Sequence, residues 1–350
     1  MTPQAHDTPT RRFPLHRLAA VAIAACGALT ACGGGGGDDK GGAVAPMSQS
    51  DATADAANAS STGSDTAAAL DTLVDTSTAL APVLAATAAA SSERAQVESL
   101  RPQTSPAPPF VNGTVACPGG GTATMTVSGG SLELVRNGQL DAGEDYKVTY
   151  AQCSGGAGLA KLDGSVEMVV TAADHATSPS SVAVNLTITH LVLSLPAGNA
   201  TLDGTAMLSR SVATTNGSTT TTSHVTVPSA TLATAFNSRS GSFTLSDLDA
   251  TRVVTSVDGV ATASQYDGHH TLAGTAWGRT FSMSVATTGN VNYDANGALV
   301  SGAWTVVRPH ATVATTIANG LVVITVDDGN DGTIDHTWTF PAAQLAASAG

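Results

Sequence analysis

Histidines and aspartates are the residues of this chain whose chemistry suits metal binding or acid–base catalysis. Seven histidines follow residue 32 and are mostly scattered: His175, His190, His224, His269, His270, His310 and His336. In a strand, Asp267 and His269 share one face, which is the start of a metal or acid–base site, while His270 points to the other face. A pair of side chains on a polar surface explains the same residues, and we favour that interpretation.

The densest group of carboxylates lies near the C-terminus. Asp327, Asp331 and Asp335 have the spacing of positions 1, 5 and 9 of a calcium-binding loop, and Gly332 stands at position 6, where such loops turn sharply. Oxygen ligands at this spacing can converge on one hard cation. Calcium at Asp327, Asp331 and Asp335 is therefore the one cofactor that the sequence suggests.

Two positions of the same run depart from a calcium-binding loop. Gly329 replaces the ligand at position 3, and Trp338 replaces the bidentate Glu at position 12. The flanking segments, 321–326 and 333–340, alternate like strands, whereas a calcium loop of this kind lies between helices. We therefore expect a tight acidic hairpin turn, with bound calcium as the alternative.

Motifs of known catalytic machinery are missing from the sequence. It contains no G-x-S-x-G, S-x-x-K, H-E-x-x-H or C-x-x-C motif and no phosphate-binding glycine loop. A catalytic triad stays open, because Ser, Thr and Asp are abundant. Trp277, Trp304 and Trp338 lie in apolar strand contexts, where core packing is favoured over a stacking platform for sugars.

The first 32 residues have the features of an export signal. Arg11, Arg12 and Arg17 precede an uncharged stretch at 18–31, which is too short to span a bilayer. The stretch ends in Leu29-Thr30-Ala31-Cys32, which resembles the lipobox of bacterial lipoproteins. The resemblance implies cleavage after residue 31 and a diacylglycerol on the Cys32 thiol. An ordinary signal peptide is the alternative.

The residue after the lipobox cysteine bears on location. In that family an Asp after the cysteine keeps the protein at the inner membrane, and here Gly33 follows. The resemblance therefore implies a lipid anchor in the outer membrane of a Gram-negative envelope, on the periplasmic or the surface face.

Cys117 and Cys153 remain for another role. An exported protein enters an oxidising compartment, so we predict a Cys117–Cys153 disulfide. It closes a loop of about 37 residues and stabilises the fold by about 4 kcal/mol on the chain-entropy model. A redox or metal pair is the alternative, but such pairs usually have close cysteine spacing.

Composition divides the rest of the chain into three parts. Residues 32–64 are Gly, Ala, Ser, Thr and Asp with almost no large apolar side chain, which predicts a disordered tether. Residues 65–109 combine a helical apolar stripe with a Pro-rich linker, which predicts a helical spacer packed on the next domain or, alternatively, a partner-binding helix.

Residues 110–350 have the pattern of antiparallel strands. Apolar and polar residues alternate in 161–171 and 279–285, and a one-residue change of phase near His190 predicts a bulge. Leu-Asp-Gly-Ser at 162–165, Leu-Asp-Gly-Thr at 202–205 and Leu-Ala-Gly-Thr at 272–275 form a weak repeat, which we expect to open strands. Dipeptides such as Asn216-Gly217, Gly289-Asn290 and Asn319-Gly320 predict hairpin turns.

We therefore expect an all-β domain of roughly 14 to 17 strands, judged by alternation and turn spacing. Short connections favour an antiparallel meander, and so many strands in a flat sheet predict curling into a barrel-like or two-layer sheet.

The net charge of −13, without a basic face, excludes nucleic acid as a partner. The sequence favours a lipid-anchored envelope protein that is not an enzyme and serves as a structural or interaction module. Its partner is an unidentified envelope protein or apolar ligand. A barrel-like carrier of an apolar ligand is the alternative, and an envelope hydrolase ranks third.

Overall fold

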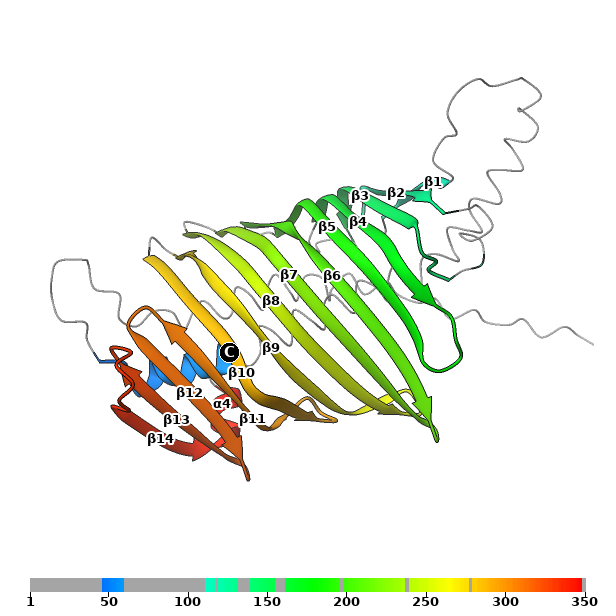
Figure 1. Cartoon of the computed structure of the whole chain (residues 1–350). Helices are drawn as coiled ribbons and strands as arrows, with labels where there is room; N and C mark the ends of the chain where they lie inside the picture. The colour runs from blue at the N-terminus through cyan, green and yellow to red at the C-terminus, as the bar shows by residue number, and fades with distance from the viewer. Residues whose placement is uncertain are drawn as a thin grey trace, which may run out of the picture.

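The computed structural model describes residues 46–59, 111–117, 119–130, 137, 139–154, 161–195, 198–236, 239–276 and 279–347. They contain a helix at residues 49–59, here called the N-terminal helix, and a short helix α4 (Ala342–Ala347). The fourteen strands (Figure 1) are β1 (Val111–Ala116), β2 (Thr122–Gly129), β3 (Glu144–Ser154), β4 (Lys161–Asp174), β5 (Ser180–Leu195), β6 (Gly198–Thr215), β7 (Ser218–Phe236), β8 (Arg239–Val257), β9 (Val260–Ala276), β10 (Arg279–Asp294), β11 (Leu299–Arg308), β12 (Ala311–Ala318), β13 (Leu321–Asp328) and β14 (His336–Pro341).

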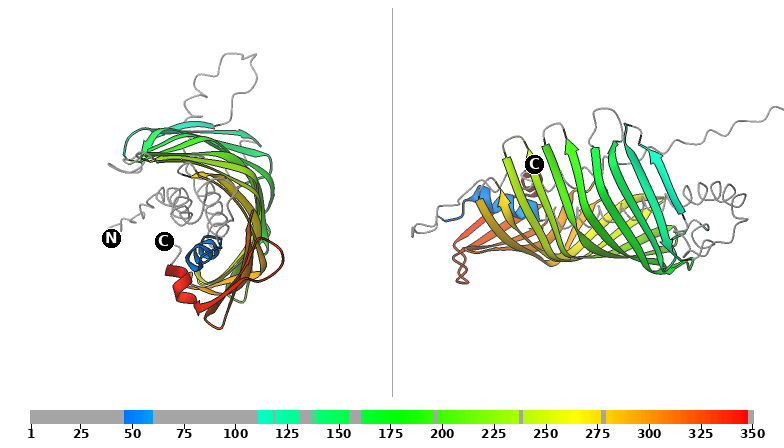
Figure 2. Two further views of the ribbon diagram at one scale, coloured as in Figure 1. Left: turned by 90° about the vertical axis from the view of Figure 1, so that its left-hand side faces the viewer. Right: turned by 90° about the horizontal axis from the view of Figure 1, so that it is seen from above.

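The strands form one sheet in chain order, from β1 to β14, and successive strands pair antiparallel. The predicted all-β antiparallel meander is confirmed. Closure is not: the sheet is open, with β1 and β14 at its two edges, and it curves into a trough (Figure 2). Neither a closed barrel nor a second sheet layer is formed by the described residues.

The strands are shortest at the two edges of the open sheet. β7 and β8 are 19 residues long, but β1 and β14 have only 6. Two such short edges offer few backbone groups for pairing with each other, and short edge strands also protect an open sheet from pairing with other chains. A flat sheet of fourteen strands is unfavourable, and the curvature of this sheet avoids it.

One face of the sheet forms the core. β12 and β13 alternate between buried and less buried residues, as strands with one buried face do. Val127, Val225, Val313 and Ile324 are fully buried in a main cluster that reaches from β2 to β14. The N-terminal helix lies on this concave side (Figure 2, blue), so the concave face is the inner face and the convex face the outer one.

A line of backbone irregularities crosses the long strands. Gln152, His190 and Asp247 have positive φ values of 49°, 47° and 54°. The register shifts beside each of them, between β3 and β4, β5 and β6, and β8 and β9. Bulges increase twist and bend a strand, so this line of bulges is where the sheet curves. The predicted bulge near His190 is confirmed.

The weak repeat of the sequence lies on this line. Asp163 accepts a hydrogen bond from the backbone N–H of Gln152 at 2.8 Å, and Asp203 accepts one from that of His190 at 2.6 Å. Each aspartate thus holds a left-handed residue on the preceding strand. The glycine after each aspartate lies close to the neighbouring backbone, since a Cβ on Gly164 would approach the carbonyl oxygen of His190 to 2.1 Å.

The repeat marks a strand start, as we expected, in only one of its three copies, because 162–165 lies at the start of β4. Asp203 lies well inside β6, and the 272–275 copy lies near the end of β9. Sequence alternation continues through a bulge, so composition cannot separate a kink from a strand end. Among the predicted turns, Asn216-Gly217 and Asn319-Gly320 are confirmed, with positive φ at all four residues. Gly289-Asn290 was wrong, because it forms an irregular part of β10.

The N-terminal part differs from its prediction. Residues 49–59, expected to belong to a disordered tether, form the N-terminal helix and bury Ala52, Ala56 and Ala57 to 0–1% exposure. The predicted helical segment at 65–109 and the lipobox at Cys32 lie outside the described residues. No described helix is long and apolar enough to cross a membrane.

We expect Gly164→Ala to destabilise the fold by about 2–4 kcal/mol, because Gly164 combines a φ of +107° with the close approach of His190. Urea unfolding measures the change. Gly113→Ala is the matched control, because a Cβ there has nothing within 4 Å. Equal stability of the two variants would show that the sheet does not depend on close packing at the bulge line.

Candidate functional site

Polar contacts hold the N-terminal helix, and Met47 just before it, at the end of the sheet. Arg308 on β11 forms an ion pair and hydrogen bond with Asp55. The indole N–H of Trp304 donates to the carbonyl oxygen of Ala56 at 3.1 Å. The backbone N–H of Met47 donates to both carboxylate oxygens of Asp328, at 3.1 and 3.2 Å. Small alanines let the helix approach the sheet closely, so these contacts form without large side chains between them.

Asp55 carries the most unusual electrostatics of this junction. Its side chain is 4% exposed, and its Oδ2 atom has no hydrogen-bond partner. Desolvation raises the pKa of Asp55 to about 6, although the charge and hydrogen bond of Arg308 act in the opposite direction. The docked helix therefore contains a carboxyl group that takes up a proton in a mildly acidic medium.

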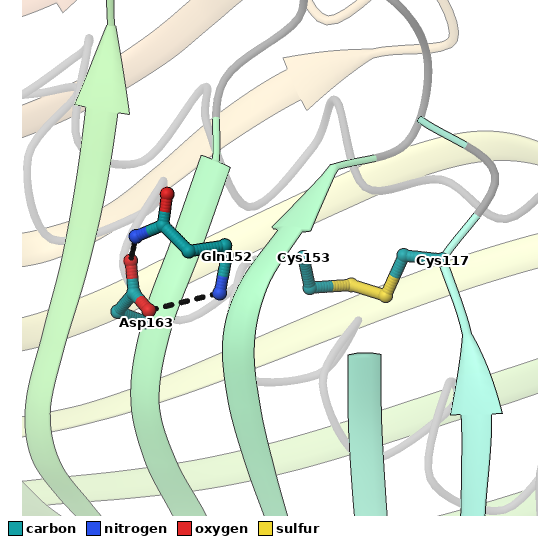
Figure 3. Close-up of a disulfide and its surroundings, with 4 residues drawn as sticks. All are labelled: Cys117, Gln152, Cys153 and Asp163. Atoms are coloured by element: carbon teal, nitrogen blue, oxygen red, sulfur yellow. Dashed lines mark hydrogen bonds between the residues drawn. A yellow bond between two sulfur atoms is a disulfide. The ribbon is translucent and has the colours of Figure 1, made fainter. Parts of the chain in front are cut away.

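The disulfide joins the first strands of the sheet (Figure 3). Cys117, just after β1, is bonded to Cys153 in β3, as the sequence predicts, with their Cα atoms 5.4 Å apart. The Cys117 N–H donates to Gly121 at 3.0 Å, and the Ser154 N–H donates to Gly120 at 3.0 Å. Gln152, whose side chain binds Asp163, is the residue just before Cys153 along β3. The disulfide therefore links the end of the edge strand β1 to β3, next to the bulge at Gln152.

The acidic run at 327–335 is built as a turn. Both carboxylate oxygens of Asp327 accept backbone N–H groups, from Asp331 at 3.1 Å and Gly332 at 2.8 Å. Asp335 accepts the N–H of Asp328 at 2.8 Å. The N–H of Thr333 donates to Asp331 at 2.8 Å and lowers the pKa of that carboxyl. Each of the three predicted calcium ligands thus holds the backbone of the β13–β14 connection, as in a tight acidic hairpin.

Histidines and aspartates meet on the outer face of β7, β8 and β9. His224 Nε2 lies 2.9 Å from Asp249 Oδ1, and Asp249 stands opposite His269 in the register. Asp267 is bound by the hydroxyl of Thr287. We call His224, Asp249, Asp267 and His269 the outer histidine cluster. The described residues contain no group of three or more His, Cys, Asp or Glu side chains that could hold a metal ion.

Three other histidines lie beside aspartates that sequence spacing did not indicate. His175 lies 2.9 Å from Asp141, His190 lies 3.9 Å from Asp203, and His336 lies 3.4 Å from Asp328. The first pair joins two segments outside the strands, the second joins the β5 bulge to β6, and the third joins the ends of β13 and β14. Pairs of this kind stabilise a surface only weakly, so we assign them a local structural role.

Several buried polar groups were missed by the sequence. Glu144 is fully buried and accepts the hydroxyl of Tyr146 at 2.7 Å, while its Oε1 has no partner. Tyr266 and His270 are buried on the inner face of β9, and the Tyr266 hydroxyl and His270 Nδ1 also lack partners. Burial lowers the pKa of His270 to about 4, so its ring is neutral at pH 7. The apolar alternation of their strands gave no signal for these three residues.

The tryptophans have different surroundings. Trp304 is 1% exposed in the main cluster, which confirms core packing for that residue. Trp338 packs at the margin of the same cluster, with its ring stacked on His336 at a centroid distance of 5.3 Å. Trp277 lies outside the described residues.

Comparison with protein-family models, with curated proteins and with solved structures gave no match. The function proposed below is therefore argued from the residues of this chain alone.

Asp55→Asn is expected to flatten the pH dependence of stability. The folded pKa of about 6 exceeds the unfolded value of 3.8, so the folded state holds a proton that the unfolded state has released. The stabilisation by protonated Asp55 is complete below about pH 4 and lost as the pH rises through 6. Relative to Asp55→Asn, the natural protein should lose on the order of 3 kcal/mol of unfolding free energy between pH 4 and 7.

Urea unfolding at several pH values measures this difference. Asp258→Asn, at an exposed hairpin turn, is the matched control and should retain the profile of the natural protein. Parallel profiles for the natural protein and Asp55→Asn would contradict a raised pKa at the helix junction.

Asp327→Ala is expected to lower the free energy of unfolding by about 1–3 kcal/mol, because two backbone N–H groups lose their acceptor. Asp331→Ala removes the acceptor of one N–H and should cost less. Millimolar calcium should leave the Tm of the natural protein unchanged. A rise of several degrees with calcium that disappears in Asp327→Ala would instead establish a metal site.

Proposed function

We propose that the protein is a lipid-anchored component of the Gram-negative cell envelope that acts as a non-enzymatic interaction module. One observation carries this proposal. β5 to β10 are 16 to 19 residues long, pair along their length and expose one face to solvent. A wide, backbone-bonded surface of this kind is suited to contact with an extended partner.

Two features support an extracytoplasmic location. The lipobox-like sequence ending in Cys32 resembles the anchor site of bacterial lipoproteins, and Gly33 after it favours the outer membrane. The Cys117–Cys153 disulfide agrees with folding in an oxidising compartment. In the proposed protein, the lipid on Cys32 provides the membrane attachment and the sheet provides the binding surface.

The contacts of the N-terminal helix limit the distance between the proposed anchor and the sheet. Met47 and Asp55 are bound to β13 and β11, so residues 33–46 connect Cys32 to the sheet. Fully extended, these residues reach at most about 50 Å. The proposed anchor therefore holds the β11–β14 end of the sheet within that distance of the membrane.

Cys32→Ser is expected to move the protein from the membrane fraction to the soluble periplasmic fraction, because the thiol that receives the lipid is lost. Fractionation and labelling with a radioactive fatty acid measure the change. Cys26→Ser is the matched control, because Cys26 lies in the signal segment, and it should stay labelled and membrane-bound. Unchanged membrane association of Cys32→Ser would contradict the anchor.

Carriage of an apolar ligand with a polar group is a second candidate. The observation that favours it is two unpartnered polar atoms on the inner face of β9, the Tyr266 hydroxyl and His270 Nδ1, on the side of the sheet that holds the main apolar cluster. A ligand that satisfied them would recover the free energy lost by burying them unpaired. Native mass spectrometry of soluble Cys32→Ser protein separates the two functions: a bound species of several hundred daltons supports the carrier, and a bare mass supports the interaction module.

A further inference from the structure

The outer face of β5 to β10 has two regions with different chemistry, on either side of the bulge line. One region contains the outer histidine cluster. The other consists of small side chains in three rows that cross the strands, which we call the hydroxyl array. The first row is Thr187, Thr205, Ser229, Ser246, Thr271 and Ser284; the second is Asp203, Thr231, Thr244, Ala273 and Ser282; the third is Thr201, Ala233, Ser242, Thr275 and Thr280.

The register makes this array regular. Every neighbour within a row is a directly paired residue of the adjacent strand, so the side chains of a row repeat at about 4.8 Å across the sheet. Asp203 and Ala273 interrupt the hydroxyls of the second row, and Ala233 interrupts those of the third. Successive rows are two residues apart along each strand, or about 6.8 Å. The first row has a hydroxyl side chain on six consecutive strands, from β5 to β10. The array is therefore a lattice of hydrogen-bonding groups about 24 Å wide.

The array is held rigid from behind. On the inner face of the same strands, Phe243 packs against Leu232, Leu272 and Phe281, with the Phe243 and Phe281 ring centroids 5.8 Å apart. Ser and Thr side chains have few rotatable bonds, so fixing them on a partner costs little conformational entropy. The hydroxyl groups are thus preorganised before any partner arrives.

Charge is nearly absent from the array. Asp203 is its one ionisable residue, and that carboxylate already accepts the N–H of His190. Protein surfaces are ordinarily about a quarter or more charged, which keeps them from associating. In a chain with a net charge of −13, the array contains this single charged side chain. The chemistry of the array thus fits a partner without charge and offers nothing to an anionic one.

We propose that the hydroxyl array binds a neutral polysaccharide chain lying across β5 to β10. Ser and Thr hydroxyls both donate and accept hydrogen bonds, as sugar hydroxyls do, and a row across the strands matches an extended chain in shape. This inference rests on the proposed interaction module and names the chemistry of its partner. Without aromatic stacking the contact is made of many weak hydrogen bonds, so the affinity should depend on polymer length.

Affinity electrophoresis of the soluble Cys32→Ser protein tests this inference. The gels contain hydroxyethyl cellulose or dextran as neutral polymers, or alginate as an anionic one. The array variant combines Thr205→Val, Thr231→Val and Thr244→Val, which remove hydroxyls but keep side-chain shape and strand preference. The control variant makes the same change at Thr220, Thr222 and Thr255, on the outer face beyond the bulge line.

We expect a neutral polymer to retard the Cys32→Ser protein and the control variant. The array variant should bind the same polymer at least fivefold more weakly. Alginate should retard none of the three proteins. Equal retardation of both variants, stronger binding to alginate, or no retardation by either neutral polymer would overturn the proposal. Ser229→Ala alone is the fallback if the triple variant does not fold, and a twofold loss is expected there.

Two further measurements distinguish glycan binding from self-association of the chain and from membrane anchoring. Sedimentation at rising concentration detects a dimer; a dimer that forms in the control variant but not in the array variant would assign the array to a second copy of this chain and overturn polysaccharide binding. Membrane fractionation of the natural protein tests the anchor independently. Loss of glycan binding with an intact anchor would therefore remove this inference and leave the proposed envelope location in place.

Discussion

The structure depends on how a fourteen-stranded sheet bends without closing. A bend requires each long strand to leave the regular pleat at a matched position, and backbone groups are left unpaired there unless something receives them. In this chain a left-handed residue makes the bend and an aspartate on the next strand accepts its N–H. The glycine after that aspartate lets the backbone of the following strand approach closely. His190, Asp203 and Gly204 are one set, and Gln152, Asp163 and Gly164 are another.

The bend gives the sheet two faces with different surroundings. The inner face, together with the N-terminal helix, encloses the main apolar cluster, and the outer face stays exposed over the whole length of the strands. Hydrophobic burial then stabilises the sheet from one side only. Substitutions on the outer face should accordingly change the free energy of folding only slightly.

The sequence predicted what depends on neighbouring residues. Alternation indicated the strands, and Asn-Gly pairs indicated several hairpins. The expectation of an exported protein predicted the Cys117–Cys153 disulfide. Closure could not be predicted, because it depends on how far the bends add up over fourteen strands. The N-terminal helix was missed because its buried face is alanine, and its stability comes from Trp304 and Arg308, about 250 residues away.

The candidate site shows the same limit. Asp267 and His269 share the outer face of β9, as two-residue spacing requires, but their partners come from other strands: Thr287 for Asp267 and, by register, Asp249 for His269. Spacing along one strand predicts which side chains of that strand share a face. The neighbours on adjacent strands depend on the pairing register, which changes at each bulge.

The rows of the hydroxyl array are invisible in the sequence for this reason. Thr205, Ser229 and Ser246 are ordinary residues of a Thr-rich chain until pairing aligns them. The bulge line on which the fold depends also sets this alignment, because a shift of one residue at any bulge would turn hydroxyls inward and apolar side chains outward. The folding of the sheet and the order of its outer surface therefore have one physical origin, the matched placement of bends.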